Sequence, residues 1–164
     1  IGGGLPIGAV GGRRDIMEHL SPLGPVFHAG TLAGNPLATA AGRAALEQLT
    51  PEAYDLLRAR AARLASVLQS ACDAAGLPAA FPVVGTLVGM FFGAGPVPTN
   101  FQQATTTDER AYAAFFHAML RNGVALAPGA YEALFVGLAH TDQVIDAIGV
   151  AAAAAAAETV AALA

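Results

Sequence analysis

The sequence predicts a mixed α/β fold, and three observations indicate it. Residues 50–76 carry apolar side chains at three- and four-residue spacing, the pattern of an amphipathic helix. Residues 77–95 are rich in valine, leucine and phenylalanine separated by glycines, which is typical of short strands. Helical patterns return over residues 106–123 and from residue 141 onward. Helices alternating with short strands favour a compact α/β arrangement.

The first residues are rich in glycine and predict little regular structure. Leu5, Ile7 and Val10 suggest a short buried strand, and the glycines around them fit close approach of the backbone to a neighbour or a cofactor. A short helix is expected over residues 13–20, with its two arginines on a solvated or ion-paired face. The segment lacks a P-loop ending and a strand-to-helix GxGxxG unit, so it is not a nucleotide loop.

Residues 30–36, Gly-Thr-Leu-Ala-Gly-Asn-Pro, predict a tight loop that leads into a helix. Asn35 suits the N-cap and Pro36 the first helical position. A helix start offers unpaired N–H groups and partial positive charge, both of which suit a phosphate, and Thr31 adds a hydroxyl. The alternative is a structural loop in which Thr31 only caps a turn. His28, just ahead of the loop, is expected to bond to backbone, with a place near a cofactor as its alternative.

Two helices are expected to follow this loop. The first, over residues 36–49, is packed with alanine and predicts burial in a core or interface. The second begins at Thr50-Pro51 and ends at Gly76, and at about 25 residues it is long enough to link two domains, with a boundary along it or at its end. Three arginines at positions 58, 60 and 63 are expected on its solvated face. Its apolar stripe comprises Tyr54, Leu57, Ala61, Leu64, Leu68 and Cys72.

The second half predicts strands and two further helices. Thr106 with Glu109 resembles a capping box at the start of an aromatic-striped helix that ends at Gly123. Residues 124–126 and 134–138 read as strands around a loop over 127–132. Thr141 is expected to cap the last, alanine-rich helix.

Composition excludes several classes of function. The net charge of −4 gives no reason to expect nucleic acid or an anionic membrane as a partner. The single Cys72, expected on a helix's apolar face, excludes an internal disulfide and a cysteine-cluster zinc site, and it fits a reducing cytoplasm. No secretory signal is visible, and the uncharged runs 74–107 and 147–157 are expected to be too broken or too short to span a membrane. No carboxylate pair, Ser-His-Asp set or metal-ligand set is apparent, and no metal is expected.

Several blocks together carry a family resemblance. They are residues 1–17 (Ile-Gly-Gly-Gly-Leu-Pro-Ile-Gly-Ala-Val-Gly-Gly-Arg-Arg-Asp-Ile-Met), Gly24-Pro25, residues 30–36, Arg121-Asn-Gly-Val-Ala-Leu-Ala-Pro, Tyr131-Glu-Ala and Leu138-Ala-His-Thr-Asp. The set resembles the segment that follows the cofactor lysine in class III, fold-type I aminotransferases, and most of all the glutamate-1-semialdehyde 2,1-aminomutase family. The resemblance implies the C-terminal part of that α/β fold. Residues 1–76 would end the large cofactor-binding domain, including the linking helix, and residues 77–164 would form the small C-terminal α/β domain.

The resemblance also implies a function. Such an enzyme is a cytoplasmic homodimer that uses pyridoxal 5'-phosphate (PLP) and its pyridoxamine form. It moves an amino group within a small-molecule substrate, glutamate-1-semialdehyde, to give 5-aminolevulinate for tetrapyrrole synthesis. All eight basic residues of this chain are arginines, so the lysine that forms the Schiff base with the cofactor is absent. No catalytic residue is therefore expected in this chain, and the chain alone is expected to be inactive.

The resemblance assigns three site residues. Thr31 would contact the cofactor phosphate across the dimer interface, and Gly30 would add a backbone contact. Glu132 would face the substrate pocket, where a carboxylate repels a dicarboxylate and favours a positively charged amino group. The aminomutase pattern has Ser-Gln where this chain has Gly129-Ala130, so the pocket's polar contacts differ. The alternative for Glu132 is an exposed loop residue.

Two other functions stay open at this point. One is a class III ω-aminotransferase, which passes the amino group to a separate keto-acid acceptor. An isomerase, by contrast, needs no second substrate. The other is a lysine-free module for dimerisation or binding.

Overall fold

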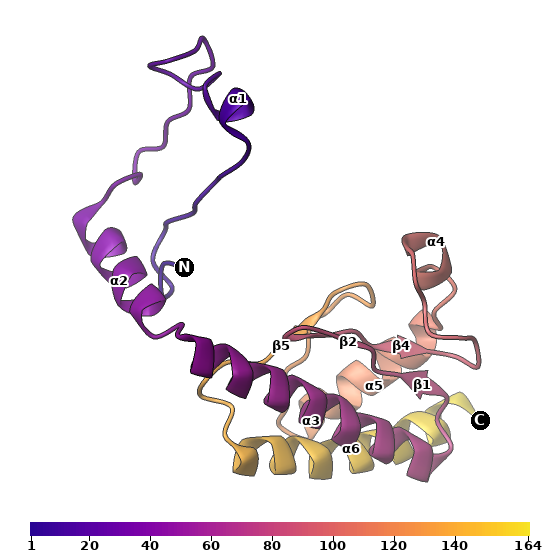
Figure 1. Ribbon diagram of the computed structural model, residues 1–164. Helices are drawn as coiled ribbons and strands as arrows, with labels where there is room; N and C mark the ends of the chain where they lie inside the picture. Colours follow the sequence, from indigo (N-terminus) through magenta and orange to yellow (C-terminus); the bar gives the residue numbers. More distant parts are fainter. The chain divides into compact units, whose positions relative to one another are not determined.

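The computed structural model describes residues 1–164, and its contacts divide them into two compact units, Ile1–Ala53 and Tyr54–Ala164 (Figure 1). The division, between residues 53 and 54, falls near the start of the helix along which, or at whose end, the sequence predicts a boundary. The long helix α3 (Pro51–Ala75) buries its apolar stripe in the core of the second unit, so it belongs with that unit by its packing. The assignment of residues 1–76 and 77–164 to a large and a small domain stays a prediction.

The first unit contains one short and one medium helix, α1 (Arg14–Met17) and α2 (Pro36–Glu47), joined by loops. The strand predicted around residues 5–10 is wrong. Leu5 and Val10 are 43% and 66% exposed, and no segment of the unit pairs with them as a strand requires. The predicted helix over 13–20 is a single turn.

Both predicted ends of α3 are confirmed. The Thr50 hydroxyl accepts a hydrogen bond from the Ala53 N–H at 3.2 Å. At the other end Gly76 has a φ of +70°, and its N–H donates to the Asp73 carbonyl while the Leu77 N–H donates to the Cys72 carbonyl. These two bonds form a Schellman motif, which needs the left-handed conformation that glycine adopts without strain.

Five very short strands form two antiparallel sheets in the second unit. One sheet pairs β1 (Ala79–Ala80) with β4 (Phe91–Phe92). The other has the order β2 (Val83–Val84), β3 (Leu87–Val88), β5 (Leu134–Phe135). The strands predicted in 77–95 are confirmed, while that at 124–126 is wrong because the Val124 N–H instead closes the preceding helix on the Met119 carbonyl.

Two helices separate the sheet segments, α4 (Phe101–Ala104) and α5 (Glu109–Arg121). The predicted capping box of Thr106 and Glu109 is wrong. The Asp108 carboxylate caps α5, accepting from the N–H groups of Arg110 and Ala111 at 2.9 and 3.0 Å. The Thr106 hydroxyl donates backward to the Gln103 carbonyl and is no longer available to α5.

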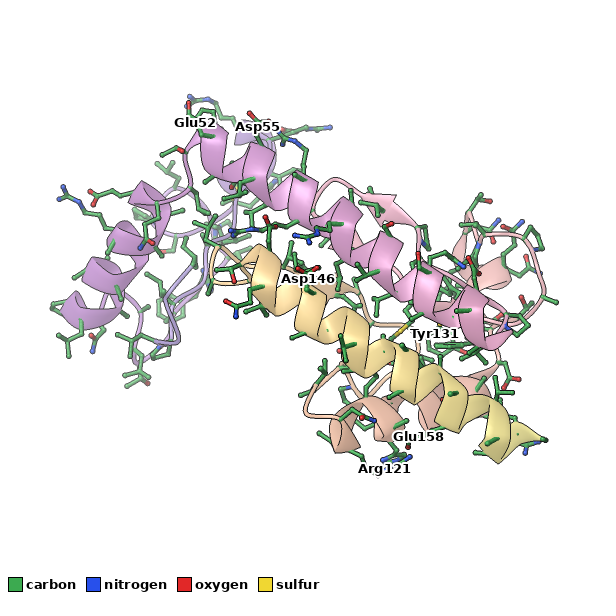
Figure 2. The ribbon with its side chains drawn as sticks, turned by 90° about the horizontal axis from the view of Figure 1, so that it is seen from below. Glu52, Asp55, Arg121, Tyr131, Asp146 and Glu158 are labelled. Carbon is green, nitrogen blue, oxygen red and sulfur yellow. The ribbon has the colours of Figure 1, made fainter.

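The last helix, α6 (Asp142–Leu163), begins at the predicted Thr141 cap. By length and composition it could cross a membrane, because it extends beyond the run 147–157 at both ends. That corrects the expectation that this part of the chain is too short. Six of its residues are buried in the protein, and Arg121 of α5 binds its Glu158 at 2.7 Å (Figure 2). These contacts favour a packed core helix.

The core of the second unit lies between α3, α5, α6 and β4. Figure 1 shows α3 and α6 running side by side, and a Cβ on Gly149 of α6 would lie 3.3 Å from that of Val67 on α3. The fully buried Phe115 of α5 packs on Phe92 of β4, with ring centroids 5.2 Å apart. Arg63 of α3 binds Asp142 and Asp146 at 2.7 and 2.6 Å, so this arginine is ion-paired across the two helices. The Arg60 guanidinium donates to the Leu138 carbonyl at 2.7 Å, so this arginine also departs from the predicted solvated face.

Candidate functional site

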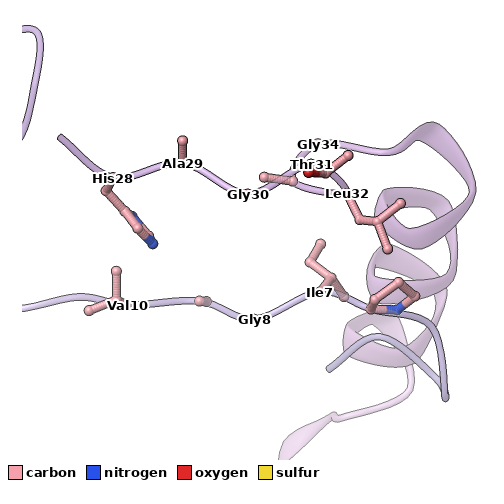
Figure 3. A pocket seen from close by; sticks show the side chains of 12 residues that line it. Ile7, Gly8, Val10, His28, Ala29, Gly30, Thr31, Leu32 and Gly34 are labelled. Atoms are coloured by element: carbon pink, nitrogen blue, oxygen red, sulfur yellow. The ribbon is translucent and has the colours of Figure 1, made fainter.

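An open pocket of about 790 Å³ lies in the first unit between residues 6–10 and residues 28–34 (Figure 3). The two segments face one another, with Ile7 on one side and His28 on the other pointing into the space between them. Both predicted cofactor contacts, Gly30 and Thr31, are among the lining residues. The structure thus places the predicted phosphate loop on a concave surface.

The local fold of the loop leaves its polar groups free. The Ala33 N–H donates to the Gly30 carbonyl at 2.9 Å and the Asn35 N–H to the Leu32 carbonyl at 3.2 Å, which makes two successive turns. Gly34, with a φ of +72°, occupies the position in the second turn that needs a left-handed backbone. The Thr31 hydroxyl and the Thr31 and Leu32 N–H groups make no hydrogen bond within the chain. A hydroxyl and two N–H groups on one turn can bind an anion.

The start of α2 contributes less than the sequence suggested. The Asn35 Oδ1 accepts from the Leu37 and Ala38 N–H groups at 2.9 and 3.3 Å, and Pro36 has no N–H. Asn35 and Pro36 are therefore the cap and first helical residue as predicted, but the expectation of unpaired N–H groups there is wrong. The same side chain that starts the helix satisfies the donors that a phosphate would have used.

His28 is the only titratable side chain in the pocket lining. Its ring makes no hydrogen bond, so the expected backbone contact is wrong. In the second unit, by contrast, His140 does bond to backbone, accepting from the Gly137 N–H at 2.9 Å. The facing wall of residues 6–10 was expected to approach a neighbour or a cofactor through its glycines, but none of its residues was assigned to the site. The signal was its glycine content, which the sequence showed, but the segment was interpreted as a buried strand.

Glu132 lies in the second unit, on the loop after Gly129. It is exposed, and its carboxylate forms no ion pair or hydrogen bond within the chain. The side chain folds over Gly129, where a Cβ would lie 2.9 Å from the Glu132 Oε1. Burial raises the pKa of the nearby Tyr112, and the charge of Glu132 raises it further. Thr31 and Glu132 belong to different units, and neither unit alone brings them together.

The residues of this chain fit one part of a PLP site. The free hydroxyl and N–H groups of the Thr31 turn suit a phosphate, but no lysine exists to bind the aldehyde of the cofactor. Cys72 cannot substitute as a nucleophile, because it is fully buried and burial raises the pKa of its thiol to about 12. No cluster of histidine, cysteine and acidic side chains is spaced for a metal.

Comparison with known proteins identifies the family. Residues 1–152 match the sequence profile of the family described as aminotransferase class-III. The chain belongs to the class III aminotransferase family. The predicted resemblance and the predicted α/β fold class are thereby confirmed. The class III chain is 53% identical over 148 residues to a glutamate-1-semialdehyde 2,1-aminomutase of Laribacter hongkongensis, and 50% identical over 147 residues to the protein of that name in Desulfosudis oleivorans.

These alignments cover 90% and 89% of this class III chain but 35% and 34% of the relatives, so the chain spans about a third of the length of the curated relatives it matches. Solved structures agree in fold. An omega-transaminase from Sphaerobacter thermophilus aligns with a TM-score of 0.69 and 26% identity over 94% of this chain and 36% of its own. A β-phenylalanine aminotransferase from Variovorax paradoxus aligns with a TM-score of 0.71 and 31% identity over 87% of this chain and 33% of its own. A transaminase with PLP bound aligns with a TM-score of 0.77 and 25% identity over 97% of this chain and 36% of its own.

Proposed function

We propose that this chain is part of a PLP-dependent glutamate-1-semialdehyde 2,1-aminomutase, which converts its substrate to 5-aminolevulinate. The observation that carries the proposal is the 53% and 50% identity to two proteins of that name over about nine-tenths of this chain. When bound, PLP supplies the electron sink for the amino transfer. The enzyme is proposed to be a cytoplasmic homodimer, with residues 1–76 in the cofactor-binding domain and 77–164 in the small domain.

Thr31 and Gly30 are proposed to bind the cofactor phosphate of the partner subunit. The support is local geometry, because the Thr31 hydroxyl and the Thr31 and Leu32 N–H groups are unsatisfied on one turn of the pocket wall. Gly30 supplies the carbonyl that closes this turn, and its proposed backbone contact to the phosphate comes in addition to those three donors. Three neutral donors neutralise only part of a phosphate's charge, and the rest must come from other groups of the enzyme.

Glu132 is proposed to bind the positively charged amino group of the substrate. Its carboxylate has no cation or donor within the chain and is exposed, so it is free to accept one. A carboxylate at this place disfavours a second substrate carboxylate, which is useful to an enzyme that must not accept free glutamate. Thr31 and Glu132 thus have separate tasks, the one holding the cofactor and the other selecting the substrate.

The test is an assay of the intact protein that carries this sequence, supplied with PLP and glutamate-1-semialdehyde and with no added amino donor or acceptor. We expect 5-aminolevulinate to form, and we expect the 164-residue chain alone to form none because it has no lysine. A Thr31→Ala variant should bind PLP more weakly, and Thr31→Ser should retain most of the affinity. Turnover that requires an added keto acid would overturn the aminomutase proposal.

The second candidate is a class III transaminase for an ω- or β-amino substrate. The structural likeness to the omega-transaminase and the β-phenylalanine aminotransferase favours it, although their identity to this chain is 26% and 31%. The same assay separates the two, because a transaminase needs a second substrate and an aminomutase does not.

A further inference from the structure

The loop over residues 127–132 carries Glu132 but is poorly supported by the core. Of its six residues only Ala130 is buried. The chain on either side, residues 124–127 and 133–136, lines a partly open, mainly apolar pocket of about 230 Å³. Residues that line a pocket have fewer packed neighbours on that side, and so fewer dispersion contacts to hold them in place. The position of Glu132 must therefore depend on specific polar and aromatic contacts.

Those contacts come from α4 and α5. The Tyr131 hydroxyl donates to the Glu109 carboxylate at 2.5 Å, and its ring lies on Phe101 with centroids 6.1 Å apart. At the other end of the loop the buried Tyr112 hydroxyl donates to the Ala127 carbonyl. Two tyrosines thus tie the two ends of one loop to one helix.

We propose that Tyr131, held by Glu109 and Phe101, is a positioning residue that fixes the loop bearing Glu132 for substrate binding. The inference rests on the proposed role of Glu132. The contacts of Tyr131 with Glu109 and Phe101 are independent of that role. Glu109 suits the task because it lies in the first turn of α5, where its carboxylate accepts the bond from the Tyr131 hydroxyl. A charged acceptor makes a stronger hydrogen bond than a neutral one.

The same hydrogen bond also bears on the protonation of Tyr131. The bond to the Glu109 carboxylate raises the pKa of the Tyr131 phenol, with smaller effects of burial and of the Glu109 charge. The phenol therefore keeps its proton at neutral pH and remains available there as a donor. The contact does not depend on a particular pH near neutrality.

The test compares Tyr131→Phe with Tyr54→Phe in the intact protein. Tyr131→Phe removes the hydroxyl and keeps the ring on Phe101. Tyr54 is the matched control, because it is 42% exposed, close to the 47% of Tyr131, and its hydroxyl makes no hydrogen bond within the chain. Hydrogen exchange of the peptide over residues 127–133 should quicken by about three- to tenfold in Tyr131→Phe and remain unchanged in Tyr54→Phe.

Glu109→Gln gives a second variant in which the fold should be unperturbed. It keeps an acceptor of the same shape without the charge, so exchange should quicken by a smaller factor, and the Tyr131 phenol should titrate at lower pH in ultraviolet absorbance. Unchanged loop exchange in both variants would overturn the proposal. Exchange that quickens equally in α3 would also overturn it, because the effect would then be general destabilisation.

Kinetics then decide whether the loop serves Glu132. In Tyr131→Phe the KM for glutamate-1-semialdehyde should rise by about three- to tenfold while kcat changes less than about twofold, because ground-state binding is weakened. An unchanged KM despite faster loop exchange would refute the positioning role. If the wild-type protein shows no aminomutase turnover, the proposed function fails, and the exchange result still decides the loop contacts.

Discussion

Large apolar side chains form a buried core in the second unit of the chain and are exposed in the first. In the second unit Phe115 is fully buried among the residues of α3, α5, α6 and β4. In the first unit Phe27 and Leu23 are 81% and 79% exposed, and the buried residues are Gly2, Ala38 and Gly42, none of which has a large side chain. One unit has a hydrophobic core of its own, whereas the other has none.

This difference separates two kinds of site residue. The Glu132 loop is attached to a unit whose burial supplies the main favourable term of folding. The Thr31 loop belongs to a unit whose large apolar side chains face water. Burial of apolar surface within that unit therefore contributes little to its stability. We expect the first unit to require further protein surface before its pocket is stable, which agrees with a chain that spans about a third of its relatives' length.

The largest expected effect contrasts two phenylalanines. Phe115→Ala should lower the free energy of unfolding of the second unit by about 3–5 kcal/mol, because it leaves a cavity in the core. Phe27→Ala, in the first unit, should change it by less than about 0.5 kcal/mol. Urea unfolding of the 164-residue chain, followed by circular dichroism, measures both. Equal effects of the two changes would mean that the units share one core.

The next effect concerns two helix caps. Asp108→Ala removes an acceptor for two N–H groups of α5 and should cost about 1 kcal/mol of the unfolding free energy of the second unit. Asn35→Ala removes the equivalent cap of α2 and should act locally, with faster hydrogen exchange at Leu37 and Ala38. Asp108→Asn and Asn35→Asp are the controls, because each retains an acceptor. A change in global stability from Asn35→Ala would contradict the independence of the two units.

A third contrast uses two helical glycines with similarly close neighbours. A Cβ on Gly149 would lie 3.3 Å from the Val67 Cβ, a branched side chain fixed between packed helices, so Gly149→Ala should destabilise by about 1 kcal/mol. A Cβ on Gly42 would lie 3.3 Å from the Ile1 carbonyl, which belongs to an irregular segment of the unit that buries no large side chain and so can shift. Gly42→Ala should therefore stabilise α2 by up to about 1 kcal/mol through helix propensity. In thermal unfolding Gly149→Ala should lower the melting temperature, whereas Gly42→Ala should slow hydrogen exchange in α2.

The sequence predicted best what is decided locally. The caps at Asn35, Thr50 and Thr141 and the stop at Gly76 depend on residues within one turn, and all four are confirmed. The cap of α5 was missed because three candidates, Thr106, Thr107 and Asp108, stand together. The Thr106 hydroxyl donates to the Gln103 carbonyl and the Thr107 hydroxyl binds Phe92 of β4, a contact across the fold that the sequence does not reveal.

The same distinction applies to the candidate site. The turn of Thr31 follows from its own glycines, so its free hydroxyl could be anticipated. The strand expected near Val10 failed because a strand needs a partner that no local pattern supplies. The tie between Tyr131 and Glu109 joins residues of the loop and of α5, and only the folded second unit brings them together. Long-range polar contacts of this kind leave no periodic signal in a sequence.

The smallest expected effect concerns two acidic residues, each paired with arginine. Bonds from Arg121, and then from Asn122, lower the pKa of Glu158, and these partners lie on another helix. Because the folded-state pKa is lowered, the stabilisation is present above the ordinary pKa of 4.5 and is lost as the pH falls through the lowered value. The pKa of Asp15 is lowered by Arg13, but that partner is two residues away and stays near in the unfolded chain.

Glu158→Gln should therefore reduce the free energy of unfolding slightly at neutral pH, with the difference from wild type vanishing as the pH falls below that window. Asp15→Asn should leave it unchanged at every pH. Urea unfolding from about pH 7 to about pH 3 measures both, and added salt should shrink the Glu158 effect because the pair is exposed to solvent. A difference for Glu158→Gln that grows as the pH falls would contradict the sign of the linkage. A measurable effect of Asp15→Asn would mean that the first unit contributes to the cooperative unfolding of the second.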